Sequence, residues 1–157
     1  MTDPKHLHRA AEIAAQAQTF SHPWNPKSQI HGVRLGFEAG LVRTGVNFAR
    51  LSPGKESFAY HAHAYEEEWI YVLSGRGLLE IDGQEHEVGE GDFAGFPPGV
   101  AHHLRNPFLQ EFVYLMGGEA KDHEVADFPK LGLRMVRRGE DIDVYRLDSG
   151  KRFPERP

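Results

Sequence analysis

The sequence predicts an all-β protein, a sandwich or barrel of short strands that follows a short amino-terminal helix. Segments rich in β-branched and aromatic residues recur from residue 30 to residue 116, and several alternate apolar and polar side chains. Glycine, proline and aspartate separate these segments at regular intervals, which is typical of sandwiches and barrels. No internal repeat is present in the 157 residues, and this length favours a single barrel.

The amino-terminal part is predicted as a helix and an arm. Residues 4–18 are rich in alanine and carry a narrow apolar stripe, which predicts a helix on the surface or against a neighbour. Residues 20–26 contain His22-Pro23 and Asn25-Pro26, and a residue before proline avoids the helical conformation. We therefore expect an extended arm here, and a first segment that covers residues 1–28.

The barrel is expected over residues 29–118. Its predicted strands cover residues 30–35, 44–51, a hairpin from 77 to 88, and residues 93–96, 101–105 and 111–116. Asp82-Gly83 lies at the centre of the hairpin and favours a tight type I′ turn. Residues 117–129 are expected to form a loop. Residues 119–157 are then expected to form an extension that packs on the barrel, with strands near 133–136 and 143–147.

Composition excludes several kinds of chemistry. The chain has no cysteine, which excludes disulfides, thiolate metal ligands and cysteine nucleophiles. Its net charge of −5 disfavours a nucleic-acid-binding surface. No apolar segment is long enough to span a bilayer, and no signal-peptide pattern is present. We therefore expect a cytoplasmic protein that binds neither nucleic acid nor membrane.

Two histidines with a spacing of two residues predict a metal site. Side chains of a strand alternate between faces, so His61 and His63 point to the same side if the segment is extended. Their Cα atoms would lie about 7 Å apart, which lets both imidazoles reach one ion.

A carboxylate donor is expected from the return strand. Glu68 is five positions after His63, so residues 64–67 must form a turn before it. Glu67 is the rival donor, and alternation alone does not choose between the two. If Glu68, Ile70 and Val72 face inward, the outward side chains are also apolar, which predicts a strand covered on both faces.

Residues 91–106 supply a further donor. A strong turn signal at Pro97-Pro98-Gly99 precedes a short strand that begins near His102. Three imidazoles and one carboxylate suit manganese, iron, nickel, copper or zinc. Four ligands would leave one or two positions for water or substrate, as catalytic sites do.

Both segments resemble the two motifs of the cupin superfamily. Residues 54–75 match Gly-x6-His-x-His-x4-Glu-x6-Gly, one residue longer at its start than the usual pattern, and residues 91–106 match the second motif at every fixed position. Residues 127–129, Asp-Phe-Pro, also resemble the tails of a poorly characterised group of small bacterial cupins. The resemblance implies a jelly-roll barrel, the double-stranded β-helix. It also implies one divalent ion (Fe, Mn, Zn or Ni) that is held by four ligands: His61, His63, Glu68 and His102. Glu68 is preferred over Glu67 because it keeps six residues before Gly75.

The other histidines are interpreted as structural or solvated. His6, His8 and His22 are expected on the surface of the helix and arm. His86 is expected on the polar side of its hairpin, and His103 should face away from the barrel interior because it follows His102 directly.

Three functions fit such a centre. The favoured one is a metal-dependent enzyme that acts on a small oxygen-rich molecule, of the dioxygenase, isomerase or decarboxylase type. The alternatives are a non-catalytic module that binds or senses a small molecule held by the metal, and a metal that only braces the barrel. Tyr114 and Phe112 are candidates for lining the pocket, and no catalytic acid or base is assigned.

A homodimer is also expected. The strand from Trp69 to Leu73 carries large apolar side chains on the face opposite the ligands, and a two-fold dimer is the commonest way to cover such a face. The arm, residues 20–35, is expected to contribute to that interface. The competing interpretation is that the arm folds back over its own subunit.

Overall fold

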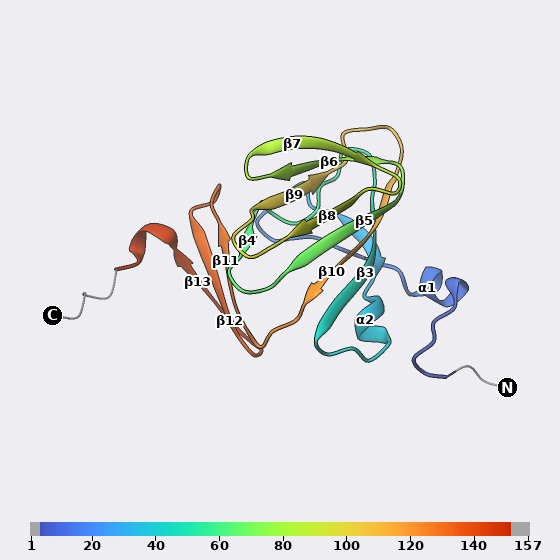
Figure 1. Cartoon of the computed structure of the whole chain (residues 1–157), viewed down its shortest axis with the longest axis horizontal. Helices are drawn as coiled ribbons and strands as arrows, with labels where there is room; N and C mark the ends of the chain where they lie inside the picture. Colours follow the sequence, from blue (N-terminus) through green and yellow to red (C-terminus); the bar gives the residue numbers. More distant parts are fainter. Residues whose placement is uncertain (1–3, 152–157) are drawn as a thin grey trace.

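Antiparallel strands dominate the computed structural model, which describes residues 4–151 (Figure 1). The largest sheet has six strands in the order β1-β2-β3-β10-β5-β8. Their bounds are β1 Gln18–Phe20, β2 Ile30–Val33, β3 Thr44–Leu51, β10 Phe112–Glu119, β5 Glu68–Ser74 and β8 Phe93–Phe96.

A second sheet of three strands faces the first and closes the barrel. It has the order β7-β6-β9, with β6 Arg76–Ile81, β7 Gln84–Gly89 and β9 His102–Arg105. The main core contains side chains of both sheets, namely Ile30, Ala49, Leu51, Ile70, Val72, Leu79, Phe96, Leu104, Phe112 and Tyr114. The fold is therefore the all-β barrel that the strand pattern predicts.

The third sheet joins the carboxy-terminal residues to the barrel. Its order is β13-β12-β11-β4, with β4 Ala62–His63, β11 His123–Phe128, β12 Leu133–Arg138 and β13 Asp141–Arg146. A 3₁₀ turn, η1 Leu147–Ser149, follows β13. β11, β12 and β13 stand at one side of the molecule in Figure 1, whereas the amino-terminal helix lies at the opposite side. The sheet matters for the site because β4 carries one of the predicted ligands.

Turn chemistry follows the sequence closely in two places. Asp82 and Gly83 have φ values of 46° and 81°, the positive values that a type I′ hairpin requires at both central residues. Gly75 connects β5 to β6 with φ 76°, and a Cβ there would lie 2.1 Å from the carbonyl oxygen of Glu111. Only glycine fits that position without displacing the backbone.

The amino-terminal prediction needs two corrections. The helix α1 spans Ala10–Gln16 and is shorter than the predicted 4–18, while a second short helix, α2 Leu35–Glu38, ends the first barrel strand at Val33. Within one chain, β1 pairs with β2 and β2 with β3, as in the competing interpretation that the arm folds back over its own subunit. Ile30 and Val33 are buried there, so these two side chains are not available to a partner.

The loop predicted at residues 117–129 was also wrong. Strand β10 continues to Glu119 and β11 covers Phe128, so only residues 120–122 connect the two strands. Glu124, Ala126 and Phe128 are the buried residues of β11. Because the first of them is charged, the alternation of apolar and polar residues that predicts a strand is not evident in the sequence. Within residues 4–151, no helix is both long and apolar enough to cross a membrane.

Candidate metal centre

Two stretches of the chain, residues 61–68 and the start of β9, bring the four predicted donors together. His61 and His102 face each other in an antiparallel bridge, and each backbone N–H donates to the other's carbonyl, at 3.2 and 2.8 Å. His63 ends β4, Glu68 opens β5 and His102 opens β9. Three of the donors therefore stand on strands of the three sheets, and His61 is held by its bridge to His102.

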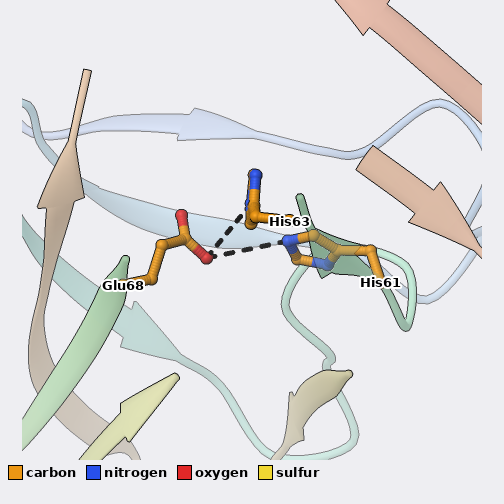
Figure 2. A group of neighbouring side chains, drawn as sticks. All are labelled: His61, His63 and Glu68. Atoms are coloured by element: carbon orange, nitrogen blue, oxygen red, sulfur yellow. Dashed lines mark ion pairs between the residues drawn. The ribbon is translucent and has the colours of Figure 1, made fainter. Parts of the chain in front are cut away.

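The donor atoms converge on one carboxylate oxygen. Oε2 of Glu68 lies 3.0 Å from Nε2 of His102, 3.3 Å from Nε2 of His63 and 3.7 Å from Nε2 of His61. Figure 2 shows His61 and His63 approaching Glu68 from neighbouring positions. Donors bound to a common ion at about 2.1 Å lie roughly 3.0 to 3.4 Å apart in octahedral or tetrahedral arrangements. The spacing around Glu68 is close to that range.

Backbone carbonyls fix two of the imidazoles in the orientation that a metal requires. Nδ1 of His61 is 2.7 Å from the carbonyl oxygen of Ala59, and Nδ1 of His102 is 3.2 Å from that of Val100. A carbonyl only accepts hydrogen bonds, so Nδ1 carries a proton when these bonds form, and Nε2 is the nitrogen that a metal can use. Metal-bound histidines usually make such a bond with the other ring nitrogen. Without a metal, Nε2 of His102 makes a hydrogen bond with the Glu68 carboxylate at 3.0 Å, so an ion would replace the proton of that bond. His61, His63 and Glu68 therefore form a group whose donor atoms could hold one ion, and His102 adjoins it through its 3.0 Å contact with Glu68.

The charges of the cluster are coupled. Burial raises the pKa of Glu68, but the three histidines outweigh burial and hold that pKa far below its ordinary value. Burial lowers the pKa of His61. Burial acts in the same direction on His63, yet Glu68 and the nearby carboxylates of Glu124 and Glu66 together raise the pKa of His63. The carboxylates around His63 therefore favour its protonated form, and a cation at the centre would compete with a proton for this ring.

Glu68, and not its neighbour Glu67, points its carboxylate at the histidines. Glu67 is exposed, and its backbone N–H donates to the carboxylate of Glu119. Inward alternation along β5 also follows the prediction, since Ile70 and Val72 are buried whereas Tyr71 is exposed. The structure thus separates two candidates that alternation left open.

The remaining histidines lie away from this cluster. His103 faces the opposite side of β9 and lies near Glu56, and His86 is exposed on β7. The two groups of potential metal donors within residues 4–151 are His61, His63 and Glu68, and His63, Glu66 and Glu124, so they include neither His6, His8 nor His22. His102 also lies outside both groups, although its Nε2 is 3.0 Å from Oε2 of Glu68. The surface prediction was wrong for His22, which is half-buried, and its ring packs against Trp24 and Phe128.

A small cavity adjoins the cluster. It has a volume of about 150 Å³, and its lining includes His61, Glu68 and His102 together with Asn47 and Ser57. A cavity of this volume admits a benzene-sized molecule in another protein. A small ligand could therefore reach the donors and meet polar groups besides them.

Phe112 and Tyr114 do not line this cavity, contrary to the expectation. Both side chains are fully buried in the main core, where their rings stack with centroids 5.0 Å apart. The polar lining residues that sequence reasoning missed are Asn47 on β3, Ser57 in the segment between β3 and β4, and Glu119 at the end of β10. None carries a motif signal, because single polar residues near strands are common.

Comparisons with known proteins agree with this architecture. A family model described as a cupin domain matches residues 47–119. The crystal structure of a putative sugar phosphate isomerase from Acidithiobacillus ferrooxidans is 33% identical, with a TM-score of 0.92 over 96% of this chain and 98% of that one. A cupin-superfamily sugar phosphate isomerase from Silicibacter pomeroyi is 25% identical, with a TM-score of 0.78 over 89% of this chain and 94% of that one.

A curated enzyme is similar over a shorter stretch. Quercetin 2,3-dioxygenase from Bacillus subtilis is 39% identical over 56 residues, which make up 35% of this chain and 17% of the dioxygenase. The first curated relatives are matched over only 17% to 43% of their own length. Fold, motifs and comparisons together place the chain in a family: it belongs to the cupin superfamily, as a small bacterial-type cupin.

Proposed function

We propose that this cupin is a metal-dependent enzyme whose ion is held by His61, His63, Glu68 and His102. The observation that carries the proposal is the convergence of three imidazole Nε2 atoms on Oε2 of Glu68. A bound divalent ion would supply a Lewis acid that polarises a carbonyl or hydroxyl oxygen of the substrate. The protein's own residues orient the imidazoles and shape the cavity beside them.

The cavity favours a small, oxygen-rich substrate without a phosphate. Two similar structures carry the description sugar phosphate isomerase. Among the described residues that line this cavity, however, there is no lysine or arginine, and Glu119 adds a carboxylate. Apart from the proposed ion, a phosphate dianion would find no lysine or arginine in the described lining to neutralise it, and the nearby Lys121 is already paired with Glu119 at 2.6 Å. We therefore infer an uncharged or singly charged hydroxy or oxo compound, with Asn47 and Ser57 as hydrogen-bonding partners.

Metal analysis followed by turnover screening tests this proposal. The protein is purified without chelators or a metal-affinity tag, its metal content is measured, and small hydroxy and oxo compounds are screened for O2 uptake and for isomerisation or CO2 release. Iron together with substrate-linked O2 consumption selects a dioxygenase, whereas turnover without O2 selects an isomerase or a decarboxylase. A protein that takes up no divalent ion rejects the proposal.

A non-catalytic binding or sensing module is the second candidate. One observation favours it. Besides the predicted ligands, the ionisable residue of the lining is Glu119. Its carboxylate accepts hydrogen bonds from Lys121 Nζ at 2.6 Å and from the Glu67 backbone N–H at 3.2 Å. A carboxylate held in this way is less available as a general base. Metal-dependent ligand binding without turnover of any screened compound would select this module.

The proposal includes a homodimer that covers the outer face of β5 and β8. Tyr71 is 41% exposed and Phe93 is 65% exposed, and the Phe93 ring stacks on Trp69 with centroids 6.4 Å apart. β8 lies at the edge of the six-stranded sheet, so this apolar surface borders an open edge. A second copy is the simplest cover for a patch of this kind.

Light scattering at micromolar concentration tests the dimer. A mass near that of one 17.7 kDa chain rejects it. Phe93→Ser should weaken the dimer, whereas Leu109→Ser, at a side chain that is 95% exposed elsewhere on the surface, should not.

A further inference from the structure

Residues 64–67 connect the histidine pair to Glu68, and one buried carboxylate of the carboxy-terminal sheet holds this turn. Glu124 on β11 is 1% exposed. Its Oε1 accepts hydrogen bonds from the backbone N–H groups of Ala64 at 2.9 Å and Tyr65 at 3.1 Å, and its Oε2 accepts one from Glu66 at 2.7 Å. A single side chain thus fixes three consecutive peptide groups between two metal donors.

Glu66 forms a second link between the turn and the carboxy-terminal residues. This side chain is 4% exposed, and its Oε1 accepts hydrogen bonds from the Lys121 backbone N–H at 2.7 Å and from the guanidinium of Arg137. Its Oε2 lies 3.7 Å from Nδ1 of His63. Backbone carbonyls face Nδ1 of the other two histidines, so His63 alone among the three has a carboxylate on that side.

His63, Glu66 and Glu124 do not form a second cation site. Their potential ligand atoms lie within 4.8 Å of one another, which is compatible with a cation. Backbone N–H groups already occupy both oxygens of Glu124, and Arg137 brings a positive charge to Glu66. The arrangement therefore suits a scaffold better than a cation site.

We propose that Glu124 and Glu66 are positioning residues of the metal centre, supplied by strand β11 and by the turn that it holds. Glu124 sets the path of the chain from His63 to Glu68, and Glu66 places a negative charge 3.7 Å from Nδ1 of His63, beyond hydrogen-bond distance. The inference rests on the proposed metal binding and deepens it, because it makes the carboxy-terminal sheet a part of the site. Partners of metal ligands typically change metal affinity by about 10- to 100-fold when they are mutated.

Glu124→Gln tests the first part of the inference. Glutamine keeps one acceptor oxygen, but its NH2 group would face the N–H of Glu66, and two donors repel each other. We expect the Zn²⁺ affinity, measured by competition with a chromophoric chelator, to fall about 10- to 100-fold. The visible spectrum of the Co²⁺-loaded protein should also change, because it reports the arrangement of the ligands. A purely structural role would not alter that spectrum in the folded protein.

Asp143→Asn is the matched control, because it removes one carboxylate of the same carboxy-terminal sheet. Asp143 pairs with Arg138, and its side chain is 42% exposed. This variant should keep the wild-type Zn²⁺ affinity and Co²⁺ spectrum.

Glu66→Gln provides an independent arm if Glu124→Gln does not fold. Its amide oxygen can still accept from Lys121 and Arg137, and Glu124 still holds the turn. Loss of the negative charge beside Nδ1 of His63 should lower the Zn²⁺ affinity by about tenfold.

The outcomes separate this inference from the proposed function. If the wild-type protein takes up no divalent ion, the proposed metal binding fails. If the wild type binds metal and every folded variant at Glu124 or Glu66 retains its Zn²⁺ affinity and Co²⁺ spectrum, the metal centre stands and the positioning role is wrong.

Discussion

Two adjacent histidines of strand β9 face two different cavities. His102 points into the barrel, where the cavity beside the donor cluster measures about 150 Å³. His103 points outward, into a cavity of about 440 Å³ that is also lined by Glu56, Glu80 and Lys130. The outer cavity is the larger and carries more charge, yet the inner one holds the candidate metal centre.

The difference lies in where the polar atoms are directed. In the outer cavity, Lys130 donates to both oxygens of Glu80 at 2.6 and 2.7 Å, and Arg105 pairs with Glu85. In the inner site, the Nε2 atoms of three histidines converge on one oxygen of Glu68. Convergence of donors, rather than cavity volume or charge density, therefore distinguishes a metal centre from a solvated surface cavity.

Removal of one carboxylate from each cavity should give the largest contrast. Glu68→Gln should lower the Zn²⁺ affinity by at least about 100-fold. Removal of a ligand lowers metal affinity more than removal of a group that only hydrogen-bonds to a ligand. Glu56→Gln in the outer cavity should leave the affinity within about twofold of wild type. Competition titration of the two variants measures the contrast. An equal loss in both would show that the outer cavity takes part in metal binding.

Acidification should lower the Zn²⁺ affinity of the inner site by a smaller factor than the loss of Glu68. The pKa of His63 is raised, so a proton occupies this ligand at pH values at which an ordinary histidine is already neutral. Below that pKa, the ion must displace the proton, and the Zn²⁺ affinity should fall about tenfold per pH unit for one displaced proton. Burial lowers the pKa of His103, so the outer histidine should not contribute. A constant affinity between pH 8 and pH 5.5 (roughly the range in which histidines titrate) would contradict this account.

The smallest expected effect concerns a polar group of the barrel interior that lies outside the donor cluster. Tyr114 is fully buried, and its hydroxyl has no hydrogen-bond partner within the described part of the chain. Tyr114→Phe should therefore raise the free energy of unfolding by about 1 kcal/mol, because an unsatisfied buried hydroxyl destabilises the fold. Urea denaturation of the metal-free protein measures this change. A loss of stability would mean that the hydroxyl has a partner in solution.

Local signals predicted most of the barrel. Alternation placed Ile70 and Val72 inside, and Asp82-Gly83 predicted a turn that the positive φ values confirm. The cupin motifs named four residues that the fold brings together, although metal binding itself stays a prediction.

Features that depend on contacts between residues distant in the chain could not be predicted from the sequence. Glu124 accepts hydrogen bonds from residues that lie 58 to 60 positions earlier in the chain, and no local sequence pattern predicts such a bond. A buried glutamate also resembles a loop residue in sequence, which is why strand β11 was predicted as a loop. His22 was misplaced for a similar reason, since only the fold brings Phe128 against its ring.

The pair of histidines on β9 offers the most direct test of the metal centre. His102→Ala and His103→Ala remove the same group from adjacent positions of one strand, the first from the inner cluster and the second from the outer cavity. Metal content per chain is measured for both variants and the wild type, all purified without chelators or a metal-affinity tag. The account predicts one divalent ion per chain in the wild type and in His103→Ala, and a sharp loss in His102→Ala. Retention of the ion in His102→Ala, or its equal loss from His103→Ala, would contradict the assignment of the metal centre.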